Sequence, residues 1–269
     1  NLTPMRVQAA TGIAEASGTL AFNLTRLDLG LTVALNELAI LSPMVGQSLA
    51  GAVQLAGRVS RADPADPIAA ELAVAFKDLN IGDETVAAIL GRQPEIILEG
   101  AYGDAGAWRI SRAALAGAPL KLSGQGQGDH GRIKAQARLA HADYGDLDLR
   151  LSSLDMARFE LTLGGAALDT PLSGRVIAVR EPDGRFAARP LNLDWGNLSL
   201  HGTLAQHANG KVEGALDFLL QSDHRVSLAS LSGDAKGRVA IRYDGAVPVI
   251  EASADIAALA YGGGDEAAP

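Results

Sequence analysis

Residues 108–139 read WRISRAALAGAPLKLSGQGQGDHGRIKAQARL, and this stretch decides the fold class. Leu120 and Leu122 alternate with polar residues, and residues 133–139 repeat that alternation. Because successive side chains of a strand point to opposite faces, each arm presents one apolar and one polar face. The glycine-rich link at residues 124–131 is predicted to be the turn, because glycine tolerates positive φ. The stretch therefore predicts an antiparallel hairpin.

The hairpin pattern recurs later in the chain. Residues 186–218 read FAARPLNLDWGNLSLHGTLAQHANGKVEGALDF, about 78 residues after the first copy. Two related units are therefore expected, at about residues 83–160 and 161–243, within a repetitive β-sheet segment that spans residues 1–261. Residues 262–269 are expected to be a flexible tail or a truncation point.

The composition excludes several classes of protein. The 269 residues carry a formal net charge of −8 with acids and bases interspersed, whereas nucleic-acid binding needs a basic stripe. The absence of cysteine excludes disulfides and Cys-ligated metals. No apolar run approaches the roughly 20 residues that span a bilayer. Because the chain starts at Asn1, we interpret it as a piece of a longer protein.

Short strands dominate the rest of the chain. Residues 19–25 and 27–35 alternate, and about fifteen short strands are expected, with turn signals every 8–12 residues. Three helical pieces are predicted: residues 36–46, broken before Pro43, residues 83–91, and a turn at residues 227–232. The expected fold is all-β: an extended, curved antiparallel sheet with an apolar inner groove and a few short helical turns.

No residue pattern predicts catalysis. Residues 126–131 match G-x-G-x-x-G, but a strand follows instead of the helix that a dinucleotide site needs. His130, His201 and His207 are interpreted as solvated, and no histidine pair has metal-ligand spacing. Asp146 and Asp148 are expected on a solvated strand face. We expect no enzyme activity, no cofactor and no metal, although a carbohydrate-active β-helix enzyme stays open as an alternative.

The apolar strand face is the remaining candidate. It is either the buried side of a sheet or sandwich, or the lining of an open groove that takes lipid chains, and period alone does not separate these. Scarce aromatic residues, dominant leucine and the repetition favour the groove. The residues predicted to line it are Leu27, Leu29, Leu31, Val33, Leu120, Leu122, Ile133, Leu139, Leu147, Leu149, Leu161, Leu163, Leu191, Leu193, Leu198, Leu200, Val212 and Leu216.

Two segments resemble a known family. Residues 38–51, LAILSPMVGQSLAG, look like the L-x-x-L-S-P-L-x-G-x-x-L-x-G element of TamB-like proteins, in the wider AsmA-like group. Residues 228–241 resemble a second copy that lacks the Ser-Pro pair, and residues 83–139 resemble the family's repeat. The resemblance covers most of residues 20–260.

The resemblance implies a setting and a function. TamB-like proteins are anchored in the inner membrane of diderm bacteria and cross the periplasm as a long curved sheet, a β-taco with a hydrophobic groove. They are implicated in phospholipid transport to the outer membrane, and in outer-membrane protein assembly with the barrel partner TamA. This chain would then be an internal periplasmic segment whose ligand is phospholipid. The alternative is a structural or adhesive β-solenoid with a closed apolar core.

Overall fold

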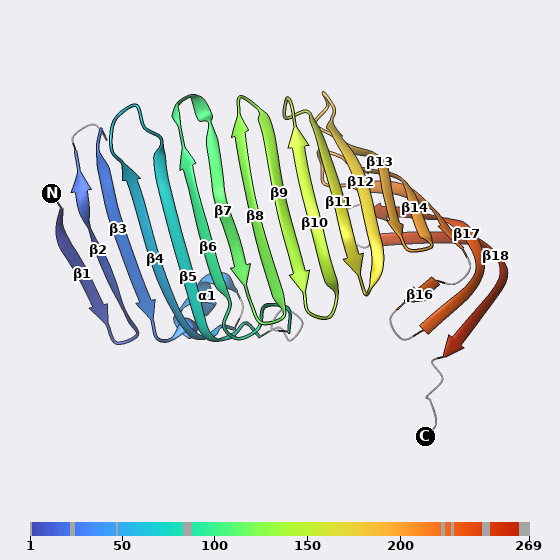
Figure 1. Cartoon of the computed structure of the whole chain (residues 1–269), viewed down its shortest axis with the longest axis horizontal. Coiled ribbons are helices and arrows are strands. Elements are labelled where there is room, and N and C mark those ends of the chain that lie inside the picture. The colour runs from blue at the N-terminus through green and yellow to red at the C-terminus, as the bar shows by residue number, and fades with distance from the viewer. Residues whose placement is uncertain are drawn as a thin grey trace, which may run out of the picture. The chain divides into compact units, whose positions relative to one another are not determined.

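The computed structural model describes residues 2–21, 25–46, 48–82, 88–221, 224–226, 229–243 and 248–263 (Figure 1). Nearly all of its regular structure is strand, as expected. The strands are β1 (Leu2–Ala9), β2 (Gly12–Leu20), β3 (Leu27–Leu35), β4 (Ala50–Arg61), β5 (Ile68–Asn80), β6 (Glu95–Tyr102), β7 (Trp108–Ala116), β8 (Leu120–Asp129), β9 (Arg132–His141), β10 (Gly145–Ser153), β11 (Arg158–Ala167), β12 (Thr170–Arg180), β13 (Phe186–Trp195), β14 (Leu198–Gln206), β15 (Val212–Leu220), β16 (His224–Val226), β17 (Ala229–Tyr243) and β18 (Pro248–Gly263).

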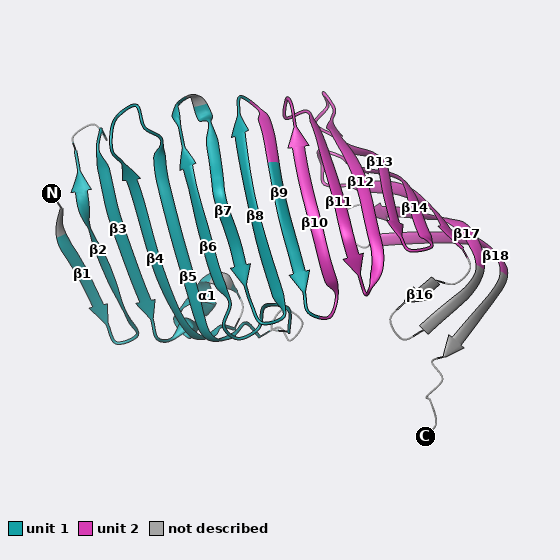
Figure 2. Ribbon diagram, viewed as in Figure 1, with its two compact units in different colours: residues 1–130, 135–142 teal, residues 131–134, 143–269 magenta. Residues whose placement is uncertain are grey.

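The chain divides into two compact units (Figure 2). Unit 1 comprises residues 1–130 and 135–142, and unit 2 comprises residues 131–134 and 143–269. In unit 1, each strand from β1 to β7 pairs antiparallel with the next strand in the chain. In unit 2, each strand from β10 to β14 does the same, β15 pairs with β17, and β17 pairs with β16 and β18. The all-β, antiparallel prediction is confirmed.

The hairpin at residues 120–141 forms, but its glycines lie elsewhere than predicted. Strand β8 runs through Gly124, Gly126 and Gly128, and only His130 and Gly131 form the turn. These two residues have φ of 44° and 84°, the backbone that a tight two-residue hairpin turn requires. Gly124, Gly126 and Gly128 instead lie opposite Ala113, Ile110 and Trp108 on β7. They are strand positions that leave room for a neighbouring side chain.

The helical predictions are partly correct. Residues 36–46 contain the 3-10 helix η2 (Leu38–Leu41) and the helix α1 (Ser42–Val45). Contrary to the prediction, the helix does not end before Pro43. Pro43 lies in the first turn of α1, where backbone N–H groups have no acceptor within the helix. A proline there costs no hydrogen bond. Residues 88–90 are helical, and residues 83–87 lie outside the described part. A second 3-10 helix, η3 (Asp104–Gly106), was not predicted.

Three segments at the two ends of the chain differ from prediction. Residues 229–232 begin β17 and are not helical, while Ser227 and Leu228 lie outside the described residues. Strand β18 extends to Gly263, into the segment expected to be a tail. Strand β1 and residues 12–18 of β2 were missed, because Ala14, Ala16 and Gly18 give too little apolar contrast to mark a period of two. The strand expected over residues 19–25 ends at Leu20.

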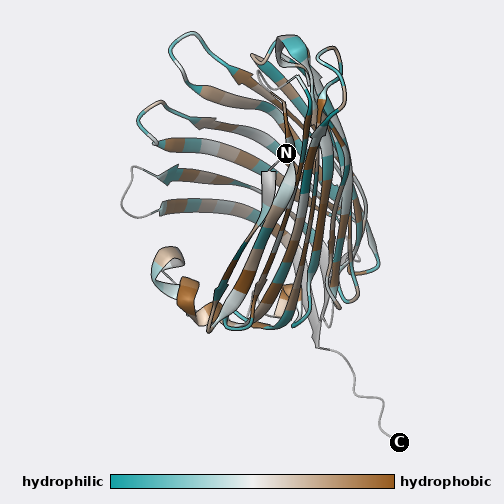
Figure 3. Cartoon of the chain, turned by 90° about the vertical axis from the view of Figure 1, so that its left-hand side faces the viewer, coloured by the Kyte–Doolittle hydropathy of each residue, from teal (hydrophilic) through white to brown (hydrophobic). Residues whose placement is uncertain are grey.

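Few side chains are fully enclosed. Among the described residues, the buried hydrophobic ones are Leu38, Leu79, Ile177, Ala187, Ala205 and Ala235. Leu38 comes from η2, which packs against β4. Most strand residues are half-buried or exposed in alternation. Figure 3 shows the same alternation of hydrophobic and hydrophilic residues along the strands.

Candidate functional site

The candidate site is the strand face that carries the predicted groove residues, which we call the leucine face. In unit 1 one row of this face crosses six strands. The residues of the row stand directly opposite one another in the register: Val33, Leu55, Val74, Ile96, Leu115 and Leu122, on β3 to β8. Since directly opposed residues point to the same side of a sheet, β3 and β8 contribute to one face. The row is apolar at every strand.

The other predicted residues of unit 1 lie on the same face. Leu27, Leu29 and Leu31 share it with Val33, because residues two apart on a strand point the same way. A Cβ added to Gly124 on β8 would lie 3.3 Å from the Cβ of Ala137 on β9, so Ala137 belongs to this face. Leu139 lies two residues further along β9 and therefore points the same way. Ile133 belongs to unit 2, and it alternates in phase with Leu139 along β9. The sequence reasoning missed Leu55, Val74, Ile96 and Leu115, although the same alternation marks them.

Unit 2 has a leucine face of its own. Leu149 stands opposite Leu163, and Leu193 opposite Leu200. A second row contains, in strand order, Leu151, Leu161, Val176, Leu191, Gly202, Leu216 and Val239. Glycines occupy this face where a neighbour is large: a Cβ added to Gly237 would lie 2.6 Å from the ring of Phe218. The predicted residues of unit 2 therefore share one face, with glycine and leucine interleaved.

The leucine face is neither sealed nor fully exposed. None of its eighteen predicted residues is buried, and Leu31 and Leu161 are exposed, at 44% and 36% of their surface. Apolar side chains in this half-exposed state retain surface that another apolar molecule can cover.

Two adjoining hollows lie on the opposite face of unit 1, which we call the small-residue face. Their volumes are about 800 Å³ and 570 Å³. Both hollows are lined by Thr32, Ala56, Ala73 and Ile97, which stand opposite one another on β3 to β6. The sequence reasoning expected a hollow on the leucine face only. The small-residue face is recessed because alanine and threonine are short beside longer neighbours at the rim, such as Arg58.

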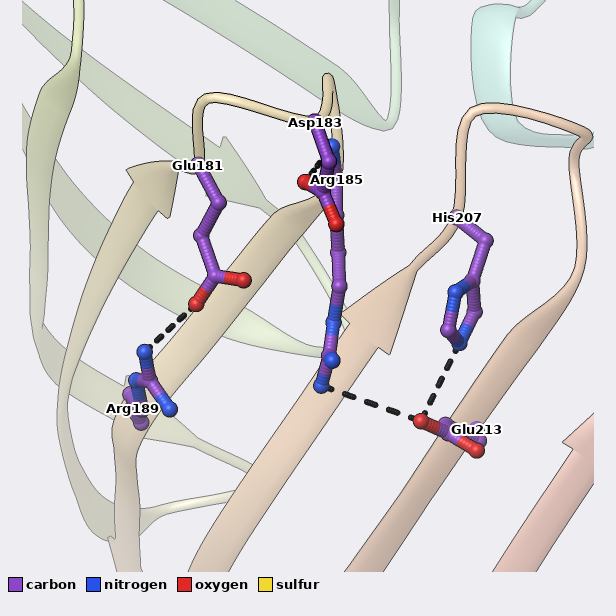
Figure 4. A network of polar contacts seen from close by, with 6 residues as sticks. All are labelled: Glu181, Asp183, Arg185, Arg189, His207 and Glu213. Carbon is purple, nitrogen blue, oxygen red and sulfur yellow. Dashed lines mark hydrogen bonds and ion pairs between the residues drawn. The ribbon is translucent and has the colours of Figure 1, made fainter.

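Charged side chains in unit 2 tie hairpin turns to their neighbours. Arg185 follows the β12–β13 turn and reaches Glu213 on β15, with 3.7 Å between Nη2 and Oε1 (Figure 4). His207, from the β14–β15 turn, approaches the same carboxylate at 3.1 Å. Nearby, Arg189 contacts Glu181 at 2.5 Å. The contacts of Arg185 and His207 with Glu213 join neighbouring hairpins of unit 2.

The other groups considered for chemistry do not converge. His130 contacts Asp129 beside the hairpin turn, and Nδ1 of His201 lies 3.1 Å from Oδ1 of Asn192 on the polar strand face. The carboxylate pair Asp146 and Asp148 lies on an exposed strand face of β10. His130, His201, Asp146 and Asp148 are exposed, as expected for solvated residues.

Within the described ranges, no group of three or more histidine, aspartate or glutamate side chains could hold a metal ion. Within the same ranges, no helix has the length and apolar character needed to cross a membrane.

Comparisons with protein-family models, with curated proteins and with solved structures found no match to this chain.

Proposed function

We propose that this chain is a non-catalytic segment that binds phospholipid acyl chains on its leucine face. The observation that carries the proposal is the apolar row from Val33 to Leu122, which runs across six strands while its side chains stay half-exposed. Covering apolar surface contributes about 25 cal/mol per Å², so an acyl chain laid along such a row gains affinity without any polar contact.

A row that crosses successive strands also suits movement along the sheet. Each strand offers an equivalent apolar position about 5 Å from the last, so no single position holds the chain much more tightly than the next. In the TamB-like setting indicated by the sequence motifs, the segment lies in the periplasm. Its parent is anchored in the inner membrane, works with an outer-membrane barrel of the TamA type, and moves phospholipid between the membranes or assists outer-membrane protein assembly.

The test replaces one leucine-face residue in each unit with a charge. Leu122→Asp and Leu200→Asp each put a carboxylate where an acyl chain must lie, and the chain cannot compensate it. We expect photo-crosslinking to phospholipid from a neighbouring leucine-face position to be lost. The free energy of unfolding should fall by no more than about 2 kcal/mol, because a half-exposed position lets water reach the charge.

The controls place the same charge on the opposite face. Lys121→Asp changes an exposed residue next to Leu122 on β8, and Thr162→Asp introduces a carboxylate between Arg150 and Arg175. Ser199, next to Leu200 on β14, is unsuitable as a control because its hydroxyl donates a hydrogen bond to Asp194 at 2.7 Å. Both controls should keep the lipid adduct. If Leu122→Asp and Leu200→Asp unfold the protein and the unmutated chain yields no adduct, the face is a closed solenoid core and the proposal fails.

A further inference from the structure

The apolar row of unit 1 continues beyond β3 to the edge strand β1 (Figure 1). Val33 stands opposite Ala14 on β2, and Ala14 stands opposite Val7 on β1. Among the described strands β1 pairs with β2 alone. Val7 is accordingly 57% exposed, whereas Leu31 of the same face, on the interior strand β3, is 44% exposed. The row that carries the proposed function therefore ends at an open strand edge.

Strand β1 protects one half of this edge and leaves the other half open. Pro4 has no N–H to donate, and the register with β2 is irregular between Leu2 and Met5. Proline and bulges both oppose the addition of another strand. Residues 5–9, in contrast, pair with β2 in a regular register and are all exposed. A strand that joins this edge therefore pairs with residues 5–9, whose middle residue is Val7.

Residues 5–9 are complementary to a second copy of themselves. Two identical strands pair antiparallel about a two-fold axis, so that each contact occurs twice. An axis through Val7 places Met5 opposite Ala9 of the second copy on the leucine face, and Arg6 opposite Gln8 on the other face. The apolar side chains then meet apolar ones, and the one charge of the stretch meets an amide.

The neighbouring registers are less favourable. An axis through Arg6 would oppose two guanidinium groups, and like charges directly opposite one another are destabilising. Arg6 already has a partner within its own chain, because its Nε lies 3.2 Å from Oε1 of Glu15. An axis through Met5 would bring Pro4 into the pairing, where its missing N–H loses a hydrogen bond between the strands. Both comparisons favour the axis through Val7.

We infer that β1 is a self-pairing interface, through which two copies of this chain join their sheets about an axis at Val7. The axis is perpendicular to the sheet, so both copies present the leucine face on the same side. The row from Leu122 to Val7, which crosses eight strands, then continues at the same level into the second copy. Because the pairing segment is short, the dimer is weak and depends on concentration.

This interface does not depend on the proposed function, since it arises from the strand edge and its register. If acyl chains do bind the leucine face, the dimer gives them one continuous apolar row across both copies. The partner copy then contributes half of the site.

The experiment uses the absence of cysteine from the 269-residue chain, which makes each introduced thiol unique. Val7→Cys places two thiols opposite one another with their Cβ atoms about 5 Å apart, so we expect a disulfide-linked dimer on mild oxidation. A mixture of Met5→Cys and Ala9→Cys chains should form the mixed dimer. Met5→Cys alone should not be linked, because residue 5 of the two copies lies about 13 Å apart along the strands. Intact-mass spectrometry identifies each product.

Leu31→Cys is the matched control, an apolar residue of the same face on an interior strand. It should give little dimer. Adding Val7→Lys to the Met5→Cys and Ala9→Cys chains should reduce the mixed dimer about tenfold, because lysine on an edge strand opposes pairing.

Three results would overturn the inference. Equal linkage of Leu31→Cys and Val7→Cys would show that the copies meet through their leucine faces. Linkage of Met5→Cys with itself would show another register, and no linkage of Val7→Cys at any concentration would show that β1 does not self-pair. None of these results bears on the lipid adduct, which tests the proposed function separately.

Discussion

Gly128 lies on the leucine face directly opposite Trp108, with no room for a side chain between them. The same relation recurs at Gly237, which faces Phe218, and at Gly174, where an added Cβ would lie 3.0 Å from Leu193. In each pair the glycine has no side chain, so the large apolar side chain of the opposed residue can lie over its Cα. Gly128 is therefore a packing residue.

We expect Gly128→Ala to destabilise unit 1 by about 1–3 kcal/mol, the usual cost of overpacking, because Trp108 must leave its position. Urea unfolding followed by tryptophan emission measures the change. Gly164→Ala is the matched control: that glycine also lies within a strand, no atom lies within 4 Å of an added Cβ, and stability should stay equal or rise slightly. Equal effects of the two substitutions would contradict the packing role of Gly128.

Neighbouring strands are also tied by charge pairs on their polar faces. Arg58 on β4 donates to both carboxylate oxygens of Asp28 on β3, at 2.9 Å and 3.0 Å. Arg58 stands opposite Gly30, which has no side chain and leaves the guanidinium free to reach along β3. The hydrogen bond from Arg58 holds the pKa of Asp28 below its ordinary value. Both groups are solvent-exposed, so this tie is weak.

The sign of that pKa shift predicts a pH dependence. A carboxylate whose pKa is lowered by folding stabilises the folded state above the unfolded pKa, near pH 4, and this contribution disappears as pH falls through the folded value. Asp28→Asn should therefore lower stability slightly at pH 7, and the difference from the unmutated chain should shrink below about pH 4.

Urea unfolding at pH 7 and pH 3 measures this difference, and Arg58→Gln in the Asp28→Asn background isolates the pair. A stability difference that stays constant between the two pH values would show that the pair does not titrate as inferred.

At the scale of the whole molecule, β1 and β18 each have one pairing partner among the described strands. β1 pairs with β2, and β18 pairs with β17. Val7 on β1 and Val249 on β18 are 57% and 51% exposed. An edge strand presents unpaired backbone groups that another chain can satisfy.

We expect the 269-residue chain to self-associate with rising concentration, as measured by sedimentation velocity. Val7→Lys and Val249→Lys together should weaken the association, because lysine on an edge strand opposes pairing. Lys121→Glu, on an interior strand, should not change it. A single monomeric species at high concentration would contradict the prediction.

The sequence alone determined the all-β class and the two faces of most strands, because a period of two is a local property of the chain. Leu122 and Leu200 were placed on the apolar face of their strands for that reason. Only the tertiary structure decided which residues stand opposite one another. Register depends on contacts between segments far apart in sequence, so the row from Val33 to Leu122 could not be predicted from spacing.

The same difference between local sequence pattern and contacts among distant segments explains which other features could be predicted. The local sequence predicted that Gly128 lies in a turn. In the structure Gly128 pairs with Trp108 across β7 and β8, so it is a strand residue. The hollows of the small-residue face depend on Thr32, Ala56 and Ala73 lining up across strands. Local pattern determines which way a side chain points along its strand, whereas neighbouring strands decide what that side chain meets.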